Sequence, residues 1–220
     1  MLLLALDTAT DRGSLALLTD DRVVAERALD TPGSFLMHLL PALDTLLAQA
    51  GHSLAEIAAI CVSQGPGNFT GLRLGLATAQ GLALALKIPA VPVPTLEVLA
   101  APLAGSPHPV AAVADAKRQE VYLGLFGCRG EFPEPLAPPV RLAAADLPGR
   151  LEPPVTLTGP GLRPHRDFLS KHLAPGVQLA PEDLWLPQAA TVGRLGRRRL
   201  AQGLTVAPPQ LTPLYLRPAL

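Results

Sequence analysis

The sequence predicts an α/β protein with two lobes, and three observations indicate this class. Three short apolar strands open the chain, a glycine-rich turn then joins a fourth strand to a long apolar helix, and a second strand pair follows residue 104. Strands that alternate with amphipathic helices are typical of α/β sheets. We expect two lobes of mixed sheet with flanking helices, residues 1–103 and a smaller lobe of residues 104–220 whose final segment is free to pack back on the first.

The first lobe begins with a predicted three-strand meander. Leu2–Leu6 is continuously apolar and ends at Asp7, and Asp11-Arg12-Gly13 provides a turn. Ser14–Leu18 and Val23–Leu29 have the length and composition of the second and third strands. Because the connections are short, we expect neighbouring strands of this group to run antiparallel.

The first helix is predicted over Phe35–Ala50, where leucines recur every three or four residues. Ser34 is positioned to cap it. Pro41 would cost about 3 kcal/mol in a regular helix interior, so we expect a kink there or a helix that starts afresh at Pro41. Further on, Ser53 and Glu56 have the spacing of a capping box and predict a short helical turn.

A glycine-rich loop connects the next strand to the most apolar helix of the chain. Ala58–Val62 is the predicted strand, Gly65–Asn68 the turn, and Thr70 is placed to cap a helix that continues to Leu86. Such a helix N-terminus receives anions, which makes a phosphate loop the first hypothesis. No Walker lysine follows Gly71, however, so the loop is not a P-loop.

The helix that follows carries more apolar surface than a single core requires. Its apolar side chains cover more than half of the circumference, whereas a helix packed on one core needs a stripe of about 100°. Gly75 and Gly81 each cost about 1 kcal/mol relative to alanine, which indicates close approach of another backbone. Two interpretations stay open: burial within a two-layer domain, or a surface that binds a partner.

The remaining elements are assigned by the same periodicities. Ala104–Pro109 is the expected hinge between the lobes, and Cys128–Pro154 is proline-rich with little pattern. The other predicted strands are Ile88–Pro94, Val110–Asp115, Val121–Gly127 and Val155–Thr158, and the other predicted helices are Thr95–Leu103, Ala143–Leu147, Leu162–Leu173 and Thr191–Gln202.

Composition excludes several classes of function. The 18 basic and 18 acidic residues give no overall positive field for nucleic acid, and Cys61 and Cys128 form no metal-binding spacing. Arg197–Arg199, with Arg194, form one basic cluster, which we interpret as a solvated helix face because no aromatic platform accompanies it. The chain start lacks the features of a signal peptide, and no uninterrupted apolar run reaches the roughly 18 residues of a membrane span. We expect a cytoplasmic protein without membrane association.

Five short runs stand out together. The most specific is Gly65-Pro66-Gly67-Asn68-Phe69-Thr70-Gly71-Leu72-Arg73, and the others are Leu4–Thr10, Leu39-Leu40-Pro41, Asp115–Tyr122 and Tyr215-Leu216-Arg217. They resemble the TsaB (YeaZ) family of proteins needed for tRNA threonylcarbamoyladenosine formation, well over residues 2–127 and weakly beyond. The resemblance implies an actin-like ATPase (ASKHA) architecture with a reduced second lobe.

The resemblance also implies a non-catalytic partner or scaffold. TsaB-like proteins bind and activate the catalytic subunit TsaD, which modifies an adenosine of ANN-decoding tRNA; the ATPase TsaE joins them, and TsaB-like proteins also form homodimers. Contact with tRNA is then indirect. The family surface is built from the two long helices of the first lobe, which here offer Phe35, Leu39, Leu43, Leu72, Gly75, Ala79, Leu82 and Leu86.

Asp7, Thr8, Asp115 and Gly159 are the candidate nucleotide-binding residues. Asp7 and Asp115 each follow a predicted strand, and carboxylates beside a phosphate can hold hydrated Mg²⁺. The alternative is that each carboxylate caps its own turn. We expect no cofactor of the chain's own, and ATP or ADP with Mg²⁺ only at an interface with its partner.

Two enzymatic alternatives are weaker than the partner interpretation. The first is an ASKHA-fold ATPase or phosphotransferase, which would use the candidate nucleotide residues. The second is an M22 metallopeptidase-like hydrolase, which would need paired metal-binding histidines on the first helix. His38 is alone there, and Phe35 stands where TsaB-like sequences often keep a histidine. We assign no catalytic residue and no metal ligand.

Overall fold

The computed structural model describes residues 1–20, 22–29 and 35–216, with the backbone alone at Phe35 and Leu36. The predicted cap Ser34 therefore lies outside the described residues. The chain forms two compact units. Unit 1 contains Met1–Pro94 and Pro187–Leu214, and unit 2 contains Thr95–Leu186 together with Tyr215 and Leu216.

Unit 1 is built on a five-stranded mixed sheet in the order β3-β2-β1-β4-β5. The strands are β1 (Leu2–Asp7), β2 (Gly13–Thr19), β3 (Arg22–Leu29), β4 (Ile57–Gly65) and β5 (Ala90–Pro94). The first three are antiparallel, which confirms the predicted meander, and β4 and β5 run parallel to β1. A parallel pair needs a crossover, and α2 supplies it between β4 and β5.

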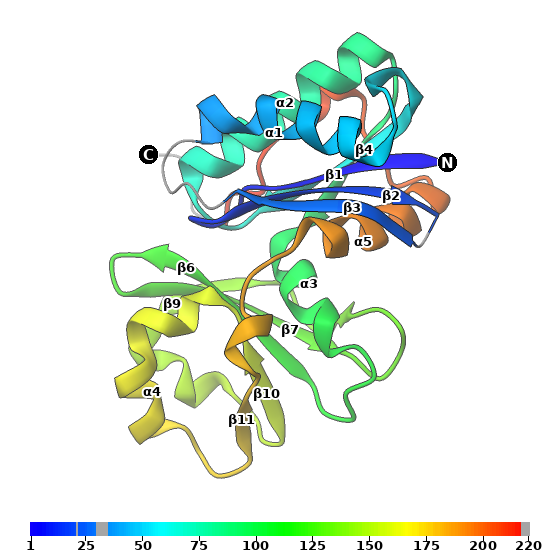
Figure 1. The fold of residues 1–220 in the computed structure, drawn as a ribbon. Helices are drawn as coiled ribbons and strands as arrows, with labels where there is room; N and C mark the ends of the chain where they lie inside the picture. Colours follow the sequence, from blue (N-terminus) through cyan, green and yellow to red (C-terminus); the bar gives the residue numbers. More distant parts are fainter. Residues whose placement is uncertain (21, 30–34, 217–220) are drawn as a thin grey trace. The chain divides into compact units, whose positions relative to one another are not determined.

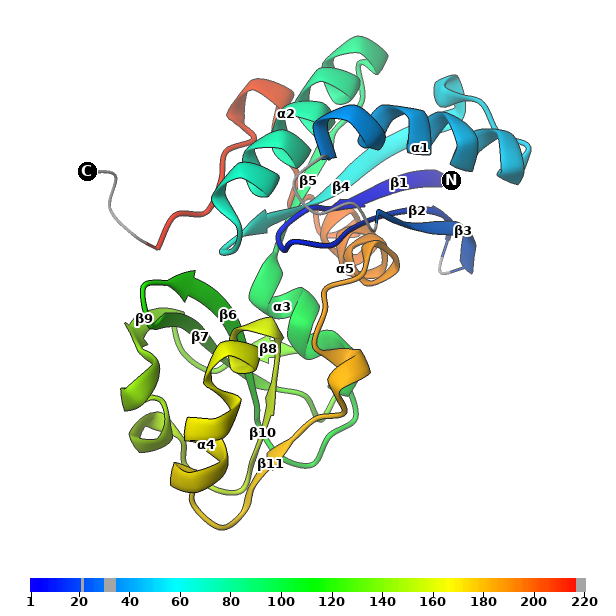
Figure 2. The same cartoon turned by 60° about the vertical axis from the view of Figure 1, so that its left-hand side comes forward.

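Helices cover both faces of this sheet. α1 (Phe35–Ala50) and α2 (Phe69–Leu86) lie on one face, and α5 (Ala189–Ala201) packs on the other (Figures 1 and 2). α1 continues through Pro41 as one helix, so the predicted alternative of a helix that starts afresh at Pro41 is wrong; the Thr45 hydroxyl donates to the Pro41 carbonyl at 2.8 Å. The predicted capping box is present, because the backbone N–H of Ser53 donates to the Glu56 carboxylate at 2.8 Å.

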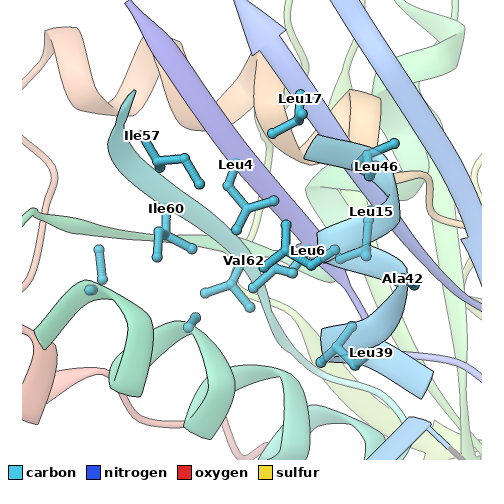
Figure 3. Packing of buried hydrophobic residues seen from close by; sticks show 14 of the residues in the cluster. Leu4, Leu6, Leu15, Leu17, Leu39, Ala42, Leu46, Ile57, Ile60 and Val62 are labelled. Atoms are coloured by element: carbon cyan, nitrogen blue, oxygen red, sulfur yellow. The ribbon is translucent and has the colours of Figure 1, made fainter. Parts of the chain in front are cut away.

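The core of unit 1 fills the space between the sheet and the first two helices. Leu4, Leu6, Leu15 and Leu17 of β1 and β2 point toward α1, where Leu39 and Leu46 meet them (Figure 3). On the opposite face, a Cβ atom at Gly193 of α5 would collide with Leu18, and one at Gly196 would collide with Cys61. Both faces of β1, β2 and β4 are covered, which explains why these strands are largely apolar.

Unit 2 contains a six-stranded sheet in the order β11-β10-β6-β7-β8, with β9 also paired to β7. Its strands are β6 (Val110–Lys117), β7 (Glu120–Gly127), β8 (Glu134–Pro135), β9 (Val140–Ala143), β10 (Val155–Thr158) and β11 (Val177–Leu179), and its α-helices are α3 (Thr95–Ala100) and α4 (Arg166–His172). The short strands β8, β9 and β11 were not predicted. Two of them fall in the proline-rich segment, where the pairing with β7 decides the conformation.

Three other assignments differ from the predictions. The units divide between Pro94 and Thr95 rather than between Leu103 and Ala104. The segment Pro187–Leu214 belongs to unit 1, because α5 covers the second face of its sheet. The helix predicted over Leu162–Leu173 is divided into a 3₁₀ segment, Pro160–His165, and α4.

α2 is long and apolar enough to cross a membrane by length and composition alone. The predicted absence of such a segment counted only uninterrupted apolar runs, and α2 includes Arg73 and Gln80. Core helices of globular domains pass the same test, and α2 packs on β4. Only 33% of it is buried, however, so its apolar surface exceeds what packing on the sheet uses.

Candidate functional site

The loop before α2 is tied to the turn between β1 and β2. The backbone N–H of Asn68 donates to the Ala9 carbonyl at 2.7 Å, and its side-chain amide donates to Asp11 at 2.9 Å. A Cβ atom at Gly67 would collide with Ala9, so only glycine permits this approach. These contacts fix where α2 begins relative to β1.

Asn68 caps α2, so the predicted cap at Thr70 is wrong. The Asn68 side-chain oxygen accepts from the backbone N–H of Gly71 at 3.0 Å. An anion at a helix N-terminus needs free backbone N–H groups. Those of Asn68 and Gly71 are already used, which argues against an open phosphate cradle in this loop.

Asp7 and Thr8 form a closed polar corner in unit 1. The Ser63 hydroxyl donates to Oδ1 of Asp7, while Asp7 Oδ2 and Thr8 Oγ1 are buried without a hydrogen-bond partner among the described residues. Burial raises the pKa of Asp7 to about 7. Thr8 lies directly against Gly75 of α2, where a Cβ atom would collide with its hydroxyl. Burial outweighs the hydrogen bond from Ser63 and favours the neutral carboxyl, so in this conformation Asp7 is not presented as an exposed anion that could hold Mg²⁺ beside a nucleotide.

Asp115 and Gly159 belong to unit 2, where the structure brings their loops together. A Cβ atom at Gly159, whose φ is +113°, would collide with the Val113 carbonyl two residues before Asp115. Asp115 accepts from the backbone N–H of Lys117 at 2.7 Å and pairs with its ammonium group at 2.8 Å. The carboxylate therefore caps its own turn, which is the alternative that the sequence left open.

The residues predicted to form the partner surface face mainly inward. Leu39, Leu43 and Ala79 belong to the core cluster, and Leu72 and Gly75 are also buried. Leu82 and Leu86 are half-buried against the same cluster, and the Phe35 side chain lies outside the described residues. This choice of residues needs correction, because a helical pattern alone does not say which of two apolar sides packs on the sheet.

A different set of residues forms what we call the outer face of α1 and α2. Its large apolar side chains are well exposed: Met37 by 73%, Leu40 by 50%, Phe69 by 53% and Leu84 by 61%. The rest of the outer face is Arg73, Ala77 and Gly81, all exposed. Along α2 the series Phe69, Arg73, Ala77, Gly81 has a spacing of four residues, so a wheel drawn from these positions would have found it.

The outer face has the composition of a protein-binding surface. The guanidinium carbon of Arg73 lies 3.8 Å from the centre of the Phe69 ring. Exposed aromatic, methionine and arginine side chains are enriched at interfaces, and grouped exposed apolar residues indicate a partner. Small residues at Ala77 and Gly81 leave room for a facing helix.

Neither a metal site nor a reactive thiol is evident in the described part of the chain. No group of three or more His, Cys, Asp and Glu side chains is placed to hold a metal ion among these residues. Cys61 and Cys128 are free and buried. Burial raises the pKa of Cys61 to about 12 and that of Cys128 to about 11, so neither thiol ionises at neutral pH.

Comparisons with known proteins bear on the family of this chain. The family model for TsaD, tRNA N6-adenosine threonylcarbamoyltransferase, matches residues 34–139. The chain is 34% identical over 227 residues to the tRNA threonylcarbamoyladenosine biosynthesis protein TsaB of Escherichia coli (strain K12), covering 99% of this chain and 95% of that protein. The structure of YeaZ from Pseudomonas aeruginosa matches with a TM-score of 0.83 and 31% identity, covering 98% of this chain and 99% of that one.

A more distant structure bears on the fold alone. The activator of the 2-hydroxyisocaproyl-CoA dehydratase from Clostridium difficile, solved with bound ADPNP, matches with a TM-score of 0.51 at 9% identity, covering 92% of this chain and 97% of that one. The predicted actin-like architecture is thereby confirmed. Because the similarity to TsaB extends over nearly the whole length of both chains, the protein belongs to the TsaB (YeaZ) family.

Proposed function

We propose that this chain acts in tRNA threonylcarbamoyladenosine formation as a non-catalytic partner that binds a TsaD-type catalytic subunit. The names of its close relatives support the pathway. The observation that carries the docking role is the outer face of α1 and α2, which leaves four large apolar side chains at least half exposed. Burying the exposed part of each would contribute about 1–2 kcal/mol before the costs of association.

Self-association through the same face is part of the proposal. A face that can pack against the corresponding helices of a paralogue can also pack against a second copy of this chain, since a two-fold interface uses one patch twice. Homodimer and heterodimer would then compete. A TsaE-type ATPase is expected to join the heterodimer, and tRNA is expected to be contacted through the catalytic partner.

Any nucleotide is proposed to bind only with the partner's help. Asp7 is enclosed and favours its neutral form, and Asp115 is occupied by Lys117. These features weaken the alternative of an independent ATPase or phosphotransferase. Calorimetric titration of the isolated chain with MgATP distinguishes the two: we expect no heat of binding, and a stoichiometric signal would favour the enzyme.

The docking role is tested by enlarging Gly81. No atom lies within 4 Å of a Cβ built at Gly81, so Gly81→Trp should leave the fold intact while holding a facing helix away. We expect at least a tenfold weaker affinity for the TsaD-type protein and less modified adenosine in a reconstituted reaction. Gly149→Trp in unit 2 is the matched control, because its Cβ position is equally open. Equal affinity of both variants would overturn the docking role of this face.

A further inference from the structure

A hollow of about 460 Å³ lies at the C-terminal end of α2 in unit 1. One wall is the end of the helix and the residues that follow it, and the other is a segment from near the end of the chain. The lining residues are Ala83, Leu84, Lys87, Ile88, Pro89, Thr205, Val206, Ala207 and Pro208. The hollow is open to solvent and has room for one large side chain laid against its walls.

Backbone hydrogen bonds hold both walls in place. The backbone N–H of Ile88 donates to the Ala83 carbonyl at 3.0 Å, which turns the chain sharply at the helix end. The backbone N–H of Val206 donates to the Ala90 carbonyl at 2.9 Å, so the returning segment is fixed beside β5. Leu211, just beyond, is buried in the core of unit 1. The hollow is therefore preformed.

Lys87 is the one charged residue that lines this hollow. It caps α2 in the left-handed conformation with φ of +57°, a position usually taken by glycine. A non-glycine residue there costs about 1–2 kcal/mol. A strained residue at a lined hollow suggests that its side chain is used. Lys87 makes no ion pair with another residue in the described parts of the chain.

The hollow is continuous with the outer face of α1 and α2. Leu84, which is 61% exposed, belongs to both. Leu204, which is 50% exposed, directly precedes the second wall. A partner packed along the outer face would therefore extend over the hollow at the end of α2.

We propose that this hollow is a socket for one large apolar side chain of the TsaD-type partner, with a carboxylate of the same partner segment pairing with Lys87. Apolar walls select the side chain, and the single ammonium group selects the neighbouring negative charge. This inference rests on the proposed function and adds the chemistry of the partner segment. The socket would form one end of the interface, next to the outer face of α1 and α2.

The apolar half of the proposal is tested by filling the socket. Ala207 is exposed and lines the hollow, so Ala207→Trp should occupy it without disturbing the core. We expect the dissociation constant for the TsaD-type protein to rise at least tenfold. Ala145→Trp, at an exposed position in unit 2, is the control of equal size. Unchanged melting temperatures would show that the fold is retained, and unchanged affinity of Ala207→Trp would overturn the socket.

The charged half is tested at Lys87 with two variants. Lys87→Gly removes the charge and suits the left-handed cap, so it should not lower stability, whereas Lys87→Glu reverses the charge. We expect about threefold weaker binding and loss of the salt dependence of the affinity for Lys87→Gly, and at least tenfold weaker binding with a reversed salt dependence for Lys87→Glu. Equal salt dependence in all three proteins would overturn the pairing of Lys87 with a carboxylate.

The outcomes separate this inference from the docking role. If Gly81→Trp abolishes binding while the socket variants bind normally, the outer face is an interface and the socket is wrong. If the unmodified chain forms no complex with the TsaD-type protein, both the proposed function and the socket fail.

Discussion

The two sides of α2 differ in what they contact, and its two glycines show the difference most directly. Gly75 faces inward, where the Thr8 hydroxyl leaves no space for a Cβ atom. Thr8 directly follows the enclosed Asp7 at the end of β1. Gly81 faces outward and has no atom within 4 Å of its Cβ position. The same residue type serves close packing inside the unit on one side and an open surface on the other. One helix therefore carries both the stability of unit 1 and its proposed binding face.

The largest expected effect is a loss of stability when Gly75, on the inner side of α2, is enlarged. Gly75→Leu would force bulk against Thr8, and overpacking of this kind costs about 3 kcal/mol of unfolding free energy. Urea unfolding of the variant and of Gly81→Leu measures the contrast. A similar stability for the two variants would show that the inner side is not tightly packed. Because a larger residue at Gly75 would disturb the fold, a substitution there cannot be used to test docking.

The next effect concerns the buried carboxyl beside Thr8. The folded chain keeps the Asp7 proton up to a pKa of about 7, whereas the unfolded chain releases it near 3.8, so the folded state binds more protons in this window. The contribution of Asp7 to the free energy of unfolding is then lost as pH rises from about 4 to about 7. The loss is on the order of 2–3 kcal/mol between pH 5 and pH 7. Asp7→Asn should remove that slope. Parallel unfolding curves against pH for both proteins would contradict the enclosed state of Asp7.

A smaller effect is expected at the exposed aromatic ring of the outer side. Phe69→Ala removes a side chain that is 53% exposed and stacked by Arg73. We expect its melting temperature to stay the same and its affinity for the TsaD-type protein to fall about tenfold, or about 1.4 kcal/mol. Calorimetric titration provides the affinity. A loss of stability without a change of affinity would assign Phe69 to packing within unit 1.

The smallest effect is expected at the outward glycine itself. Gly81→Ala adds a methyl group in open space and lowers the flexibility of the unfolded chain, so stability should rise by about 0.5–1 kcal/mol. Thermal unfolding detects this change. A loss of stability would mean that the outer side is already covered within the chain.

Local patterns were enough for most elements of unit 1 and for the family. The meander β1–β3 and the capping box at Ser53 and Glu56 involve segments close together in the chain, and both are present. The run from Gly65 to Arg73 pointed to the family that the full-length similarity confirms. The cap of α2 was placed at Thr70 instead of Asn68, because Asn68 is held by Ala9 and Asp11 of a distant turn.

By itself, the sequence determined the periodicities, the turns and the excess of apolar surface on α2, since these depend on residues close together in the chain. Only the tertiary structure decided which side of α2 faces the sheet, because both sides are apolar and the choice depends on contacts with Thr8 and the core. It also decided that α5 returns to unit 1 and that Asp7 is enclosed beside Ser63. Those outcomes follow from contacts between segments far apart in sequence, which local patterns do not contain.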